Sequence, residues 1–546
     1  MSRQGIIIIY LFLLALIIRL VSLAVFGFID TGGGTDSVTY LLLAKNLFSG
    51  NGFTEFGVPH TIHHPLYPIL IGLVLKIVGD AVMAAHLVSV LAGAALVIPV
   101  YLLGKHLFGL KAGMYSGICV AVFPILVYGS DEAFSESLYT FLLISGIAIF
   151  WVAFRKQKVA GIILAGMVIG FAFLTHPLGI MFLLALILFL FFAQLLQRFR
   201  AWKRFLINIF GLLLGFCVIC FPFWKYIHGV TGKWQLTGTT FANDISLLLG
   251  QARGMPPSEV VFHHMENLYY PSKTQFHHES IGFFKLACSQ PMALIELVRY
   301  NLIDGFQEVE KSARLLGIST WLLMTGLVGV VILLAYSLVK GKSRGKNIIS
   351  RVFLAMLFLP SLVFIMVSVE HRYIYPFVPL VLIAISKVAA DWHVRVVDQA
   401  ATFRRYAFYG VLTIAMVFML VGSSRIIYRK WAKIGIPYEY KIMGDWIKSS
   451  IPGIQKEKVM MARLGISYYA GCQWNVFYWG DYPGLITYMN KRGIRYLVID
   501  DYALPKISPG LHFLLEDDPP PSGFRMLKEF KFDGRKIKFM EYCPEL

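Results

Sequence analysis

The stretch GIIIIYLFLLALIIRLVSLAVFGFI (residues 5–29) is followed closely by the polar segment DSVTY (residues 36–40). An apolar run of about 20 residues has the length of a bilayer-spanning helix. The rest of the chain has the same character, since 57% of its 546 residues are hydrophobic, 15% are charged and the mean hydropathy is +0.67. We therefore predict a mostly α, polytopic membrane protein that carries a polar site at the membrane surface.

The net charge of +19 does not indicate a nucleic-acid partner. The basic residues lie in short loops between apolar runs, where membrane topology and anionic lipids account for them. We expect these charges to interact with the membrane, and we expect no nucleic-acid partner.

The apolar runs predict about eleven transmembrane helices. The run from Leu66 to Gly79 is short for a span, and we interpret it as an interfacial or re-entrant helix in the first outer loop. The expected spans are residues 5–29, 81–103, 112–128, 138–154, 159–175, 178–193, 206–227, 317–339, 352–369, 374–390 and 408–425.

Basic clusters in the loops fix the orientation that we predict, because positively charged loops stay in the cytoplasm. These clusters lie at residues 105–111, 155–158, 198–204, 340–351 and 395–405. With Leu66 to Gly79 left out of the count, all of these clusters fall on the cytoplasmic side. The outer side then receives residues 30–80, 129–137, 228–316, 370–373 and everything after Arg425. We expect a protein of the cell (inner or plasma) membrane with its active site on the extracytoplasmic side.

The composition after the last span changes to that of a soluble protein. We predict a transmembrane domain over residues 1–428 and a small extracytoplasmic α/β domain over residues 429–546. The latter should contain a strand from Lys458 to Gly465, a helix from Pro483 to Arg492, a strand from Ile494 to Asp500 and a hairpin over residues 526–542.

Asp36 is the first candidate for chemistry. It lies four residues before Tyr40 on a predicted amphipathic helix ending at Phe48, which places both side chains on one face. Transfer of a sugar to a hydroxyl group needs a base at the acceptor and donors or cations at the leaving phosphate. The alternative is that Asp36 only caps its helix, because it follows a run of glycines.

Other polar residues fall on the same predicted side. His63 and His64 precede Pro65, and their imidazoles are suited to phosphate or metal; the alternative is a solvated turn before proline. Between two spans, the acidic loop (residues 130–136) contains Asp131, Glu132 and Glu136. A carboxylate facing lipid is costly, so Glu136 should face a wet cavity, unless it is a solvated loop end.

For each of two arginines, both a functional and a purely structural interpretation are open. Arg372, next to His371, is placed to pair with a lipid-linked phosphate, whereas the alternative is an arginine that snorkels to the interface. Arg19 lies within the first span, where it either lines the cavity or snorkels.

These motifs together resemble the membrane-embedded C-fold glycosyltransferases, of the protein mannosyltransferase and lipid A aminoarabinose transferase type. The resemblance rests on the order of DxxxY, GxG, HHPLYP, SESL and RYxxPxxP. They stand at residues 36–40, 50–52, 63–68, 135–138 and 372–379.

The resemblance implies catalytic acids at Asp36 and Glu136. From the residues themselves we add candidates near the donor phosphate (Tyr40, His63, His64, His371 and Arg372) and secondary candidates (Asp131, Glu132 and Arg19). In the family a basic residue stands before the proline, a position held here by His64. The implied reaction is inverting transfer from a polyprenyl-phosphate sugar donor to a lipid, glycan or protein acceptor. Some members use a divalent metal ion, so a metal at Asp36 and Glu136 stays open.

Two other functions remain alternatives. A polytopic transporter or lipid flippase would also be hydrophobic, but its polar residues should cluster near the middle of the membrane. An oligosaccharyltransferase-like enzyme would also use outer acids. The segment YWGDY (residues 478–482) faintly resembles the acceptor-recognition motif of that class, with the residues in a different order.

Overall fold

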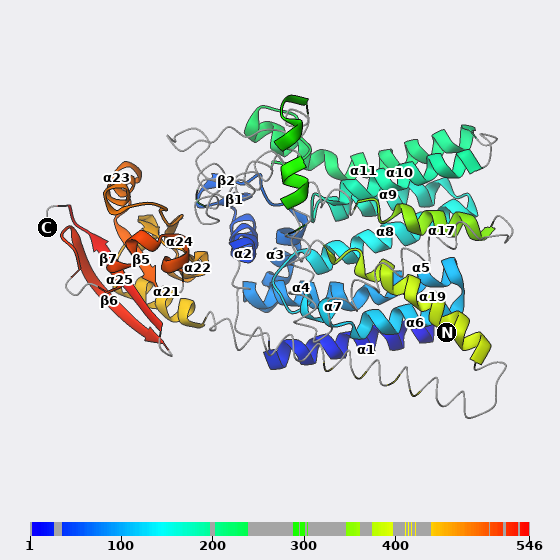
Figure 1. Cartoon of the computed structure of the whole chain (residues 1–546), viewed down its shortest axis with the longest axis horizontal. Coiled ribbons are helices and arrows are strands. Elements are labelled where there is room, and N and C mark those ends of the chain that lie inside the picture. The colour runs from blue at the N-terminus through cyan, green and yellow to red at the C-terminus, as the bar shows by residue number, and fades with distance from the viewer. Residues whose placement is uncertain are drawn as a thin grey trace.

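The computed structural model is drawn whole in Figure 1. It describes residues 3–26, 35–196, 202–238, 346–360, 374–396 and 438–544, except residues 502, 517–519, 533 and 534. Short stretches between residues 262 and 303 and single positions between residues 410 and 421 are also described. A layer of helices forms one part of the molecule and a sheet near the C-terminus forms another (Figure 1).

The helical part is built mainly of long apolar helices. Its elements are α1 (Arg3–Phe26), α4 (Ala81–Ala95), α5 (Val97–Phe108), α6 (Leu110–Val122), α7 (Pro124–Tyr128), α8 (Glu136–Lys156), α9 (Val159–Phe173), α10 (Gly179–Leu196), α11 (Trp202–Thr231), α17 (Lys346–Met356) and α19 (Val378–Val396). Within the described part, five stretches are long and apolar enough to cross a membrane: Gln4–Val25, Ala81–Phe108, Glu136–Lys156, Gly179–Leu196 and Trp202–Thr231. The chain is an integral membrane protein.

The predicted spans agree with this helical layer in part. The expected spans at residues 112–128 and 159–175 appear as the shorter apolar helices α6 with α7, and α9. The span expected at residues 317–339 lies outside the described residues, as do nearly all of residues 408–425 and much of residues 352–369. The count of eleven therefore stays a prediction.

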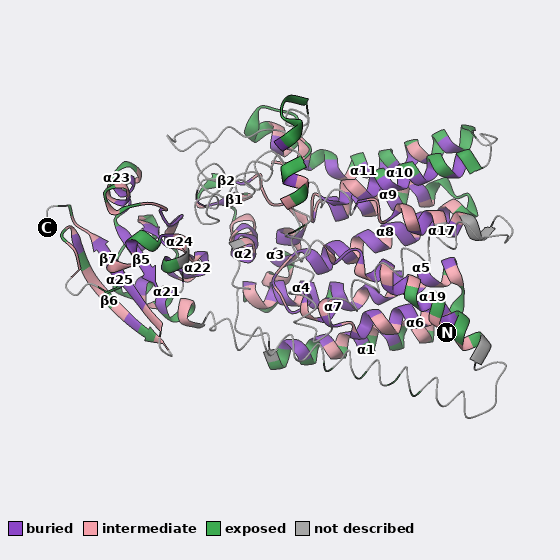
Figure 2. Ribbon diagram, viewed as in Figure 1, coloured by how far each residue is buried: buried purple, intermediate pink, exposed green. Residues whose placement is uncertain are grey.

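Small residues allow the closest contact between helices. A Cβ on Gly166 of α9 would lie 2.1 Å from the carbonyl oxygen of Leu212, and a Cβ on Gly215 of α11 would lie 2.1 Å from that of Ile163. The backbones of α9 and α11 touch here, which is how membrane helices gain packing energy without a hydrophobic driving force. Large apolar side chains on the outer faces of α1, α10 and α11 remain exposed, as a lipid-facing surface requires (Figure 2).

The segment between α1 and α4 folds at one end of the helical layer (Figure 1). It consists of α2 (Thr35–Phe48), strands β1 (Thr54–Glu55) and β2 (Val58–Pro59), and α3 (Leu66–Val78). Both helices were expected near these bounds, while the interfacial position predicted for α3 stays a prediction. The α3 helix ends at Gly79, whose φ of 80° is accessible to glycine without strain, and Asp80 then caps α4 by accepting a hydrogen bond from the Met83 N–H at 2.7 Å.

The C-terminal part contains a mixed five-stranded sheet in the order β4-β3-β5-β7-β6. Strands β3, β4 and β5 are parallel, whereas β7 runs antiparallel to β5 and β6. The elements are α21 (Tyr438–Ser450), β3 (Lys458–Met460), α22 (Leu464–Ala470), β4 (Gln473–Asn475), α23 (Tyr482–Arg492), β5 (Tyr496–Asp500), α24 (Leu504–Ile507), α25 (Phe513–Glu516), β6 (Phe524–Phe532) and β7 (Arg535–Tyr542), with short 3-10 turns at Ile454–Lys456 and Pro509–Leu511.

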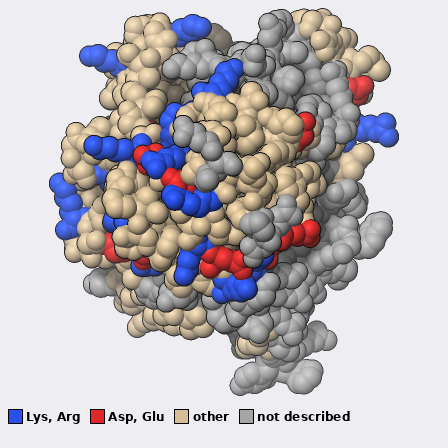
Figure 3. All heavy atoms as spheres, turned by 90° about the vertical axis from the view of Figure 1, so that its left-hand side faces the viewer, with Lys and Arg blue, Asp and Glu red and all other residues tan. Residues whose placement is uncertain are grey.

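The predictions for this part were mostly correct. The α23 helix starts at an Asp481 cap and ends at Gly493, and the hairpin pairs Phe532 with Arg535. The strand predicted from Lys458 to Gly465 is wrong in its second half, because the chain turns after Met460 and enters α22. The surface of the C-terminal part that faces away from the helical layer carries both acidic and basic side chains (Figure 3). The domain boundary at residue 428 stays a prediction.

Candidate functional site

Helix α2 positions the predicted acid and tyrosine. Asp36 lies in the first turn, where a carboxylate is stabilised by the positive end of the helix dipole. Tyr40 follows one turn later and is buried. Its hydroxyl lies 3.2 Å from Ser135 Oγ, and its ring contacts those of His63 and Tyr67 edge-on at 4.9 and 5.1 Å between centroids. Tyr40 thus connects α2 to the loop that precedes Glu136.

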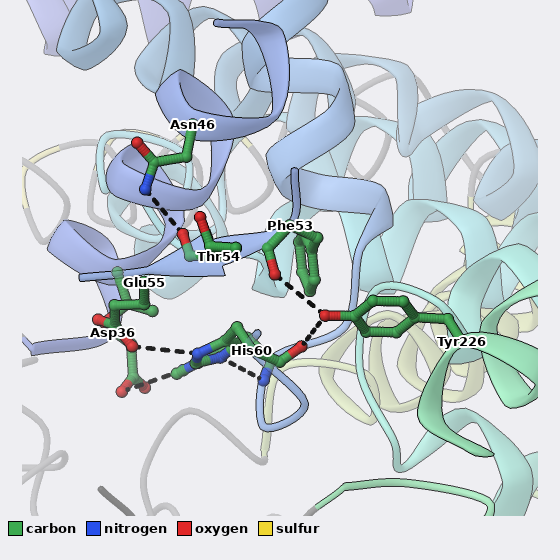
Figure 4. A network of polar contacts seen from close by, with 9 residues as sticks. Asp36, Asn46, Phe53, Thr54, Glu55, His60 and Tyr226 are labelled. Atoms are coloured by element: carbon green, nitrogen blue, oxygen red, sulfur yellow. Dashed lines mark hydrogen bonds and ion pairs between the residues drawn. The ribbon is translucent and has the colours of Figure 1, made fainter. Parts of the chain in front are cut away.

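Asp36 is the outer end of a row of four polar side chains (Figure 4). Its Oδ1 lies 3.5 Å from His63 Nε2. His63 Nδ1 lies 3.0 Å from His60 Nε2, and His60 Nδ1 lies 3.0 Å from Glu55 Oε2. Glu55 Oε1 accepts a hydrogen bond from the Thr39 hydroxyl at 2.8 Å, which closes the row onto α2. Histidine therefore separates two carboxylates, of which only Asp36 is appreciably exposed.

Burial determines whether His60, near the buried end of this row, carries a charge. The side chains of Glu55 and His60 are both 3% exposed, whereas those of His63 and Asp36 are 17% and 31% exposed. Burial lowers the pKa of His60, against the opposing effect of its hydrogen bond to Glu55. His60 is therefore neutral near pH 7, while the exposed end of the row is open to solvent.

Sequence reasoning missed Glu55 and His60. They are brought together by the β1–β2 hairpin, whose turn residues Phe56 and Gly57 have φ values of 49° and 81°. A Phe-Gly pair at a left-handed turn is uncommon because phenylalanine rarely adopts positive φ. The sequence signal that could have indicated this turn was Gly57, which lies five residues after Gly52 and three before His60.

His64 differs from its neighbour His63. Its ring packs against Phe173 and Phe223, and its Nδ1 donates to the Phe173 carbonyl oxygen. Burial lowers the pKa of His64 to about 3, so the ring is neutral and its Nε2 has no proton to donate. The alternative of two solvated histidines is wrong. The arrangement also counts against a hydrogen bond from His64 to a phosphate.

Glu136 begins α8 and is 6% exposed. It interacts electrostatically with the hydroxyl groups of Tyr67 and Tyr375. Tyr375 packs against Gly129, where an added Cβ would lie 2.1 Å from its ring. The solvated loop end that was the alternative for Glu136 is therefore wrong, because the side chain is buried and lies near Tyr67 and Tyr375. The RYxxPxxP segment also approaches the acidic loop here, through Tyr375.

Arg19 and Asp131 are held inside the protein. The guanidinium of Arg19 is fully buried; it donates to Ser130 Oγ at 3.1 Å and to the carbonyl oxygens of Ala15, Val120 and Ala121 at 3.1–3.3 Å. The Ser22 hydroxyl donates to Asp131 Oδ2. A snorkelling Arg19 is therefore wrong, because its charge is bound by the end of α6 and by the acidic loop. Both residues fix that loop onto α1.

The remaining candidates are less informative. Glu132 accepts a hydrogen bond from the Tyr128 hydroxyl at 2.8 Å. His371 and Arg372 lie outside the described residues. Among the residues that the structure describes, no group of three or more His, Cys, Asp and Glu side chains could hold a metal ion. A divalent ion at Asp36 and Glu136 stays a prediction.

Comparison with known proteins identifies the class of this fold. Residues 61–225 match the family described as dolichyl-phosphate-mannose-protein mannosyltransferase, a segment that begins just before His63 and ends within α11. No curated protein sequence matches the chain.

Solved structures similar to this fold include an oligosaccharyltransferase and ArnT. The Archaeoglobus fulgidus oligosaccharyltransferase in its apo form is similar with a TM-score of 0.65 and 14% identity, over 93% of this chain and 71% of that chain. AglB from the same organism, in complex with an inhibitory peptide and a dolichol-phosphate, has a TM-score of 0.63 and 14% identity, over 92% and 71%. ArnT from Cupriavidus metallidurans bound to undecaprenyl phosphate has a TM-score of 0.56 and 12% identity, over 98% of both chains.

At these identities the structural likeness shows the fold alone. With the matched segment, it confirms the predicted resemblance to C-fold glycosyltransferases of the protein mannosyltransferase and aminoarabinose transferase type.

Proposed function

We propose that this protein is a glycosyltransferase that moves a sugar from a polyprenyl-phosphate donor to an acceptor at the extracytoplasmic face of the cell membrane, with inversion. The observation that carries the proposal is the position of Asp36. Its carboxylate is partly exposed in the first turn of α2, at the end of the helical layer, with His63 directly behind it. A base at the rim of membrane helices can meet both a lipid-linked donor and a polar acceptor.

Each polar group has a defined part in this reaction. Asp36 accepts the proton of the acceptor hydroxyl as the acceptor oxygen attacks the anomeric carbon. Glu136 is the second acid. We assign the donor phosphate to Tyr40, His371 and Arg372, since a guanidinium can pair with two phosphate oxygens. His63 was predicted at the phosphate as well, but its Nε2 faces Asp36.

The neighbours support the donor more strongly than the acceptor. ArnT and AglB are described in complex with undecaprenyl phosphate and with a dolichol-phosphate, so a polyprenyl-phosphate fits this fold. Their acceptors differ, and a related A. fulgidus structure holds a peptide with the sequon NVT. We therefore leave the acceptor as a lipid, glycan or protein. The transporter alternative is less consistent with a polar row that ends at the rim of the helices.

The test is donor turnover by purified protein in detergent. The protein is incubated with a panel of polyprenyl-phosphate sugars, and released polyprenyl phosphate is measured with and without lipid, glycan and sequon-peptide acceptors. The proposal expects release from at least one donor, dependent on an acceptor and lost in Asp36→Asn. Asp80→Asn is the matched control, because Asp80 is also an acid at a helix start but caps α4 away from the row. Release that is unaffected by Asp36→Asn would contradict the assignment of the base.

A further inference from the structure

The protonation pattern of the row follows from its geometry, starting at the buried end. Glu55 Oε2 lies 3.0 Å from His60 Nδ1, and a negative carboxylate at that distance favours a proton on that nitrogen. A neutral histidine carries one N–H, so His60 Nε2 is an acceptor. It receives the backbone N–H of His63 at 2.9 Å.

The same argument then fixes the tautomer of His63. Its Nδ1 lies 3.0 Å from the same His60 Nε2, so a proton on Nδ1 would share that lone pair with the backbone N–H, whereas a lone pair on Nδ1 would be repelled by it, and the geometry favours Nδ1 as the protonated nitrogen. The other nitrogen of a neutral His63, Nε2, is left as a lone pair. That lone pair faces Asp36 Oδ1 at 3.5 Å. Two acceptors face each other at the exposed end of the row, an arrangement that a proton between them would stabilise.

We propose that His63 takes over the proton that Asp36 receives from the acceptor hydroxyl, and that Glu55 and His60 hold His63 in the tautomer that can accept it. This inference rests on the proposed function for the source of the proton. His63 acts through Asp36, and His60 and Glu55 position His63. A carboxylate alone is a weak base. In this row the imidazole of His63 can take up the proton that the carboxylate of Asp36 receives.

The transfer balances as follows. The acceptor O–H bond breaks while its oxygen bonds to the anomeric carbon. The bond from that carbon to the phosphate oxygen breaks, and its electron pair leaves with the polyprenyl phosphate. The proton moves to Asp36 and then to His63 Nε2, which forms an imidazolium. Solvent can remove it afterwards, because the side chains of His63 and Asp36 are 17% and 31% exposed.

Hydrogen bonds and ring contacts hold the row in place. Around His63 lie Asp36, His60, Tyr40 and His64. The His60 and His63 rings are nearly parallel, with an interplanar angle of 17°. From α11, the Tyr226 hydroxyl lies 3.0 Å from both the Phe53 and the His60 carbonyl oxygens (Figure 4). It fastens the hairpin segment to the membrane helices.

The tautomer is tested without any substrate. ¹⁵N-histidine NMR of the full-length protein in detergent reports which ring nitrogen is protonated, and the His63 signal is assigned by its absence in His63→Gln. We expect the Nδ1–H form of His63 in the wild type and a shift towards the Nε2–H form in His60→Leu. Glu55→Gln, nearly the same size as glutamate, provides a second variant if His60→Leu does not fold. An Nε2–H form of His63 in the wild type would overturn the proposal.

The proton transfer is tested by kinetics. We expect His63→Gln to lower kcat by about 10²-fold, the low end for loss of acid–base catalysis, with an unchanged KM for the donor. Imidazole should restore turnover to His63→Ala, and more basic imidazoles should restore more. The control is His512→Gln, which removes a histidine beside a carboxylate in the C-terminal part. A raised donor KM with unchanged kcat would instead make His63 a phosphate ligand and overturn the proposal.

The two tests also separate this inference from the proposed function. If the NMR result is as expected but the wild type releases polyprenyl phosphate from no donor, the proposed function and the source of the proton fail, while the fixed tautomer stands. If the wild type is active and loses activity in Asp36→Asn but not in His63→Gln, the function stands and the transfer to His63 is wrong.

Discussion

Replacing Asp36 by asparagine separates a structural from a chemical role for this residue. Asparagine has nearly the same size, stays at the first turn of α2 and is as good a residue for a helix start as aspartate. It cannot take a proton from a hydroxyl group. The same substitution also removes the negative charge that faces His63.

The structure limits how much stability this substitution can cost. The loss of a charge at a helix N-terminus costs about 0.3–1 kcal/mol. The contact with His63 is long and partly exposed, so its loss costs at most about 1 kcal/mol. Loss of a general base slows a reaction by about 10²–10⁴-fold, which corresponds to about 3–5 kcal/mol in the barrier. The expected effect on transfer therefore exceeds the expected effect on folding.

Three measurements on Asp36→Asn test this reasoning: thermal unfolding in detergent, equilibrium binding of a labelled polyprenyl-phosphate sugar, and release of polyprenyl phosphate. We expect nearly unchanged unfolding and donor binding, with turnover reduced by at least about 10². Asp80→Asn should leave all three unchanged. Wild-type turnover by Asp36→Asn with the physiological acceptor would show that Asp36 only starts its helix. Lost donor binding would show that the acid contributes to the donor site instead.

Four further outcomes are expected. Arg372→Ala should raise the donor KM, by an amount that reflects about 1.5–3 kcal/mol for a charged hydrogen bond; an unchanged KM would indicate an interfacial arginine. A cysteine placed at Ser343 should not be labelled by a membrane-impermeant reagent on intact cells, because its basic loop is predicted to be cytoplasmic, and labelling would contradict the topology. Arg19→Met should lower the thermal stability by about 2–4 kcal/mol, since it leaves Ser130 Oγ and buried carbonyls without their donor; a wild-type melting temperature would show that water replaces the guanidinium. Acidification should destabilise the protein through His64: its pKa is about 3 in the folded state and about 6.5 when unfolded, so the unfolded chain binds the extra proton as the pH falls below 6.5. At pH 5 this costs about 2 kcal/mol, and His64→Leu should lose that part of the pH dependence in thermal unfolding.

The sequence predicted those parts of the structure that local signals determine. Helices α2 and α3 were expected almost as they stand, because an apolar pattern and the stop at Gly79 define them. Helix α23 was expected from Pro483 to Arg492, with Gly493 ending it, and it spans Tyr482–Arg492. Each of these signals lies within a few residues of the helix that it defines, so the local sequence is enough to predict that helix.

The sequence could not predict the contacts that tertiary structure creates. Glu55 and His60 are ordinary polar residues in a loop until the hairpin pairs Glu55 with Val58 and Tyr226 of α11 holds His60 from far along the chain. Arg19 was ambiguous for the same reason, since its partners at Ala121 and Ser130 are more than a hundred residues away. Only folding brings these groups within hydrogen-bond distance.

Helix α2 has two faces with different partners, and this links the C-terminal part to the site. Tyr40 faces Ser135 and the membrane helices. Val38 belongs to the apolar core of the C-terminal part, Leu42 packs against that core, and Lys45 Nζ lies 4.0 Å from the centre of the Tyr468 ring on α22. A cation over an aromatic ring contributes about 0.5–2 kcal/mol. Because one rigid helix carries all these contacts and Asp36, any shift of the C-terminal part relative to the membrane helices must also move Asp36.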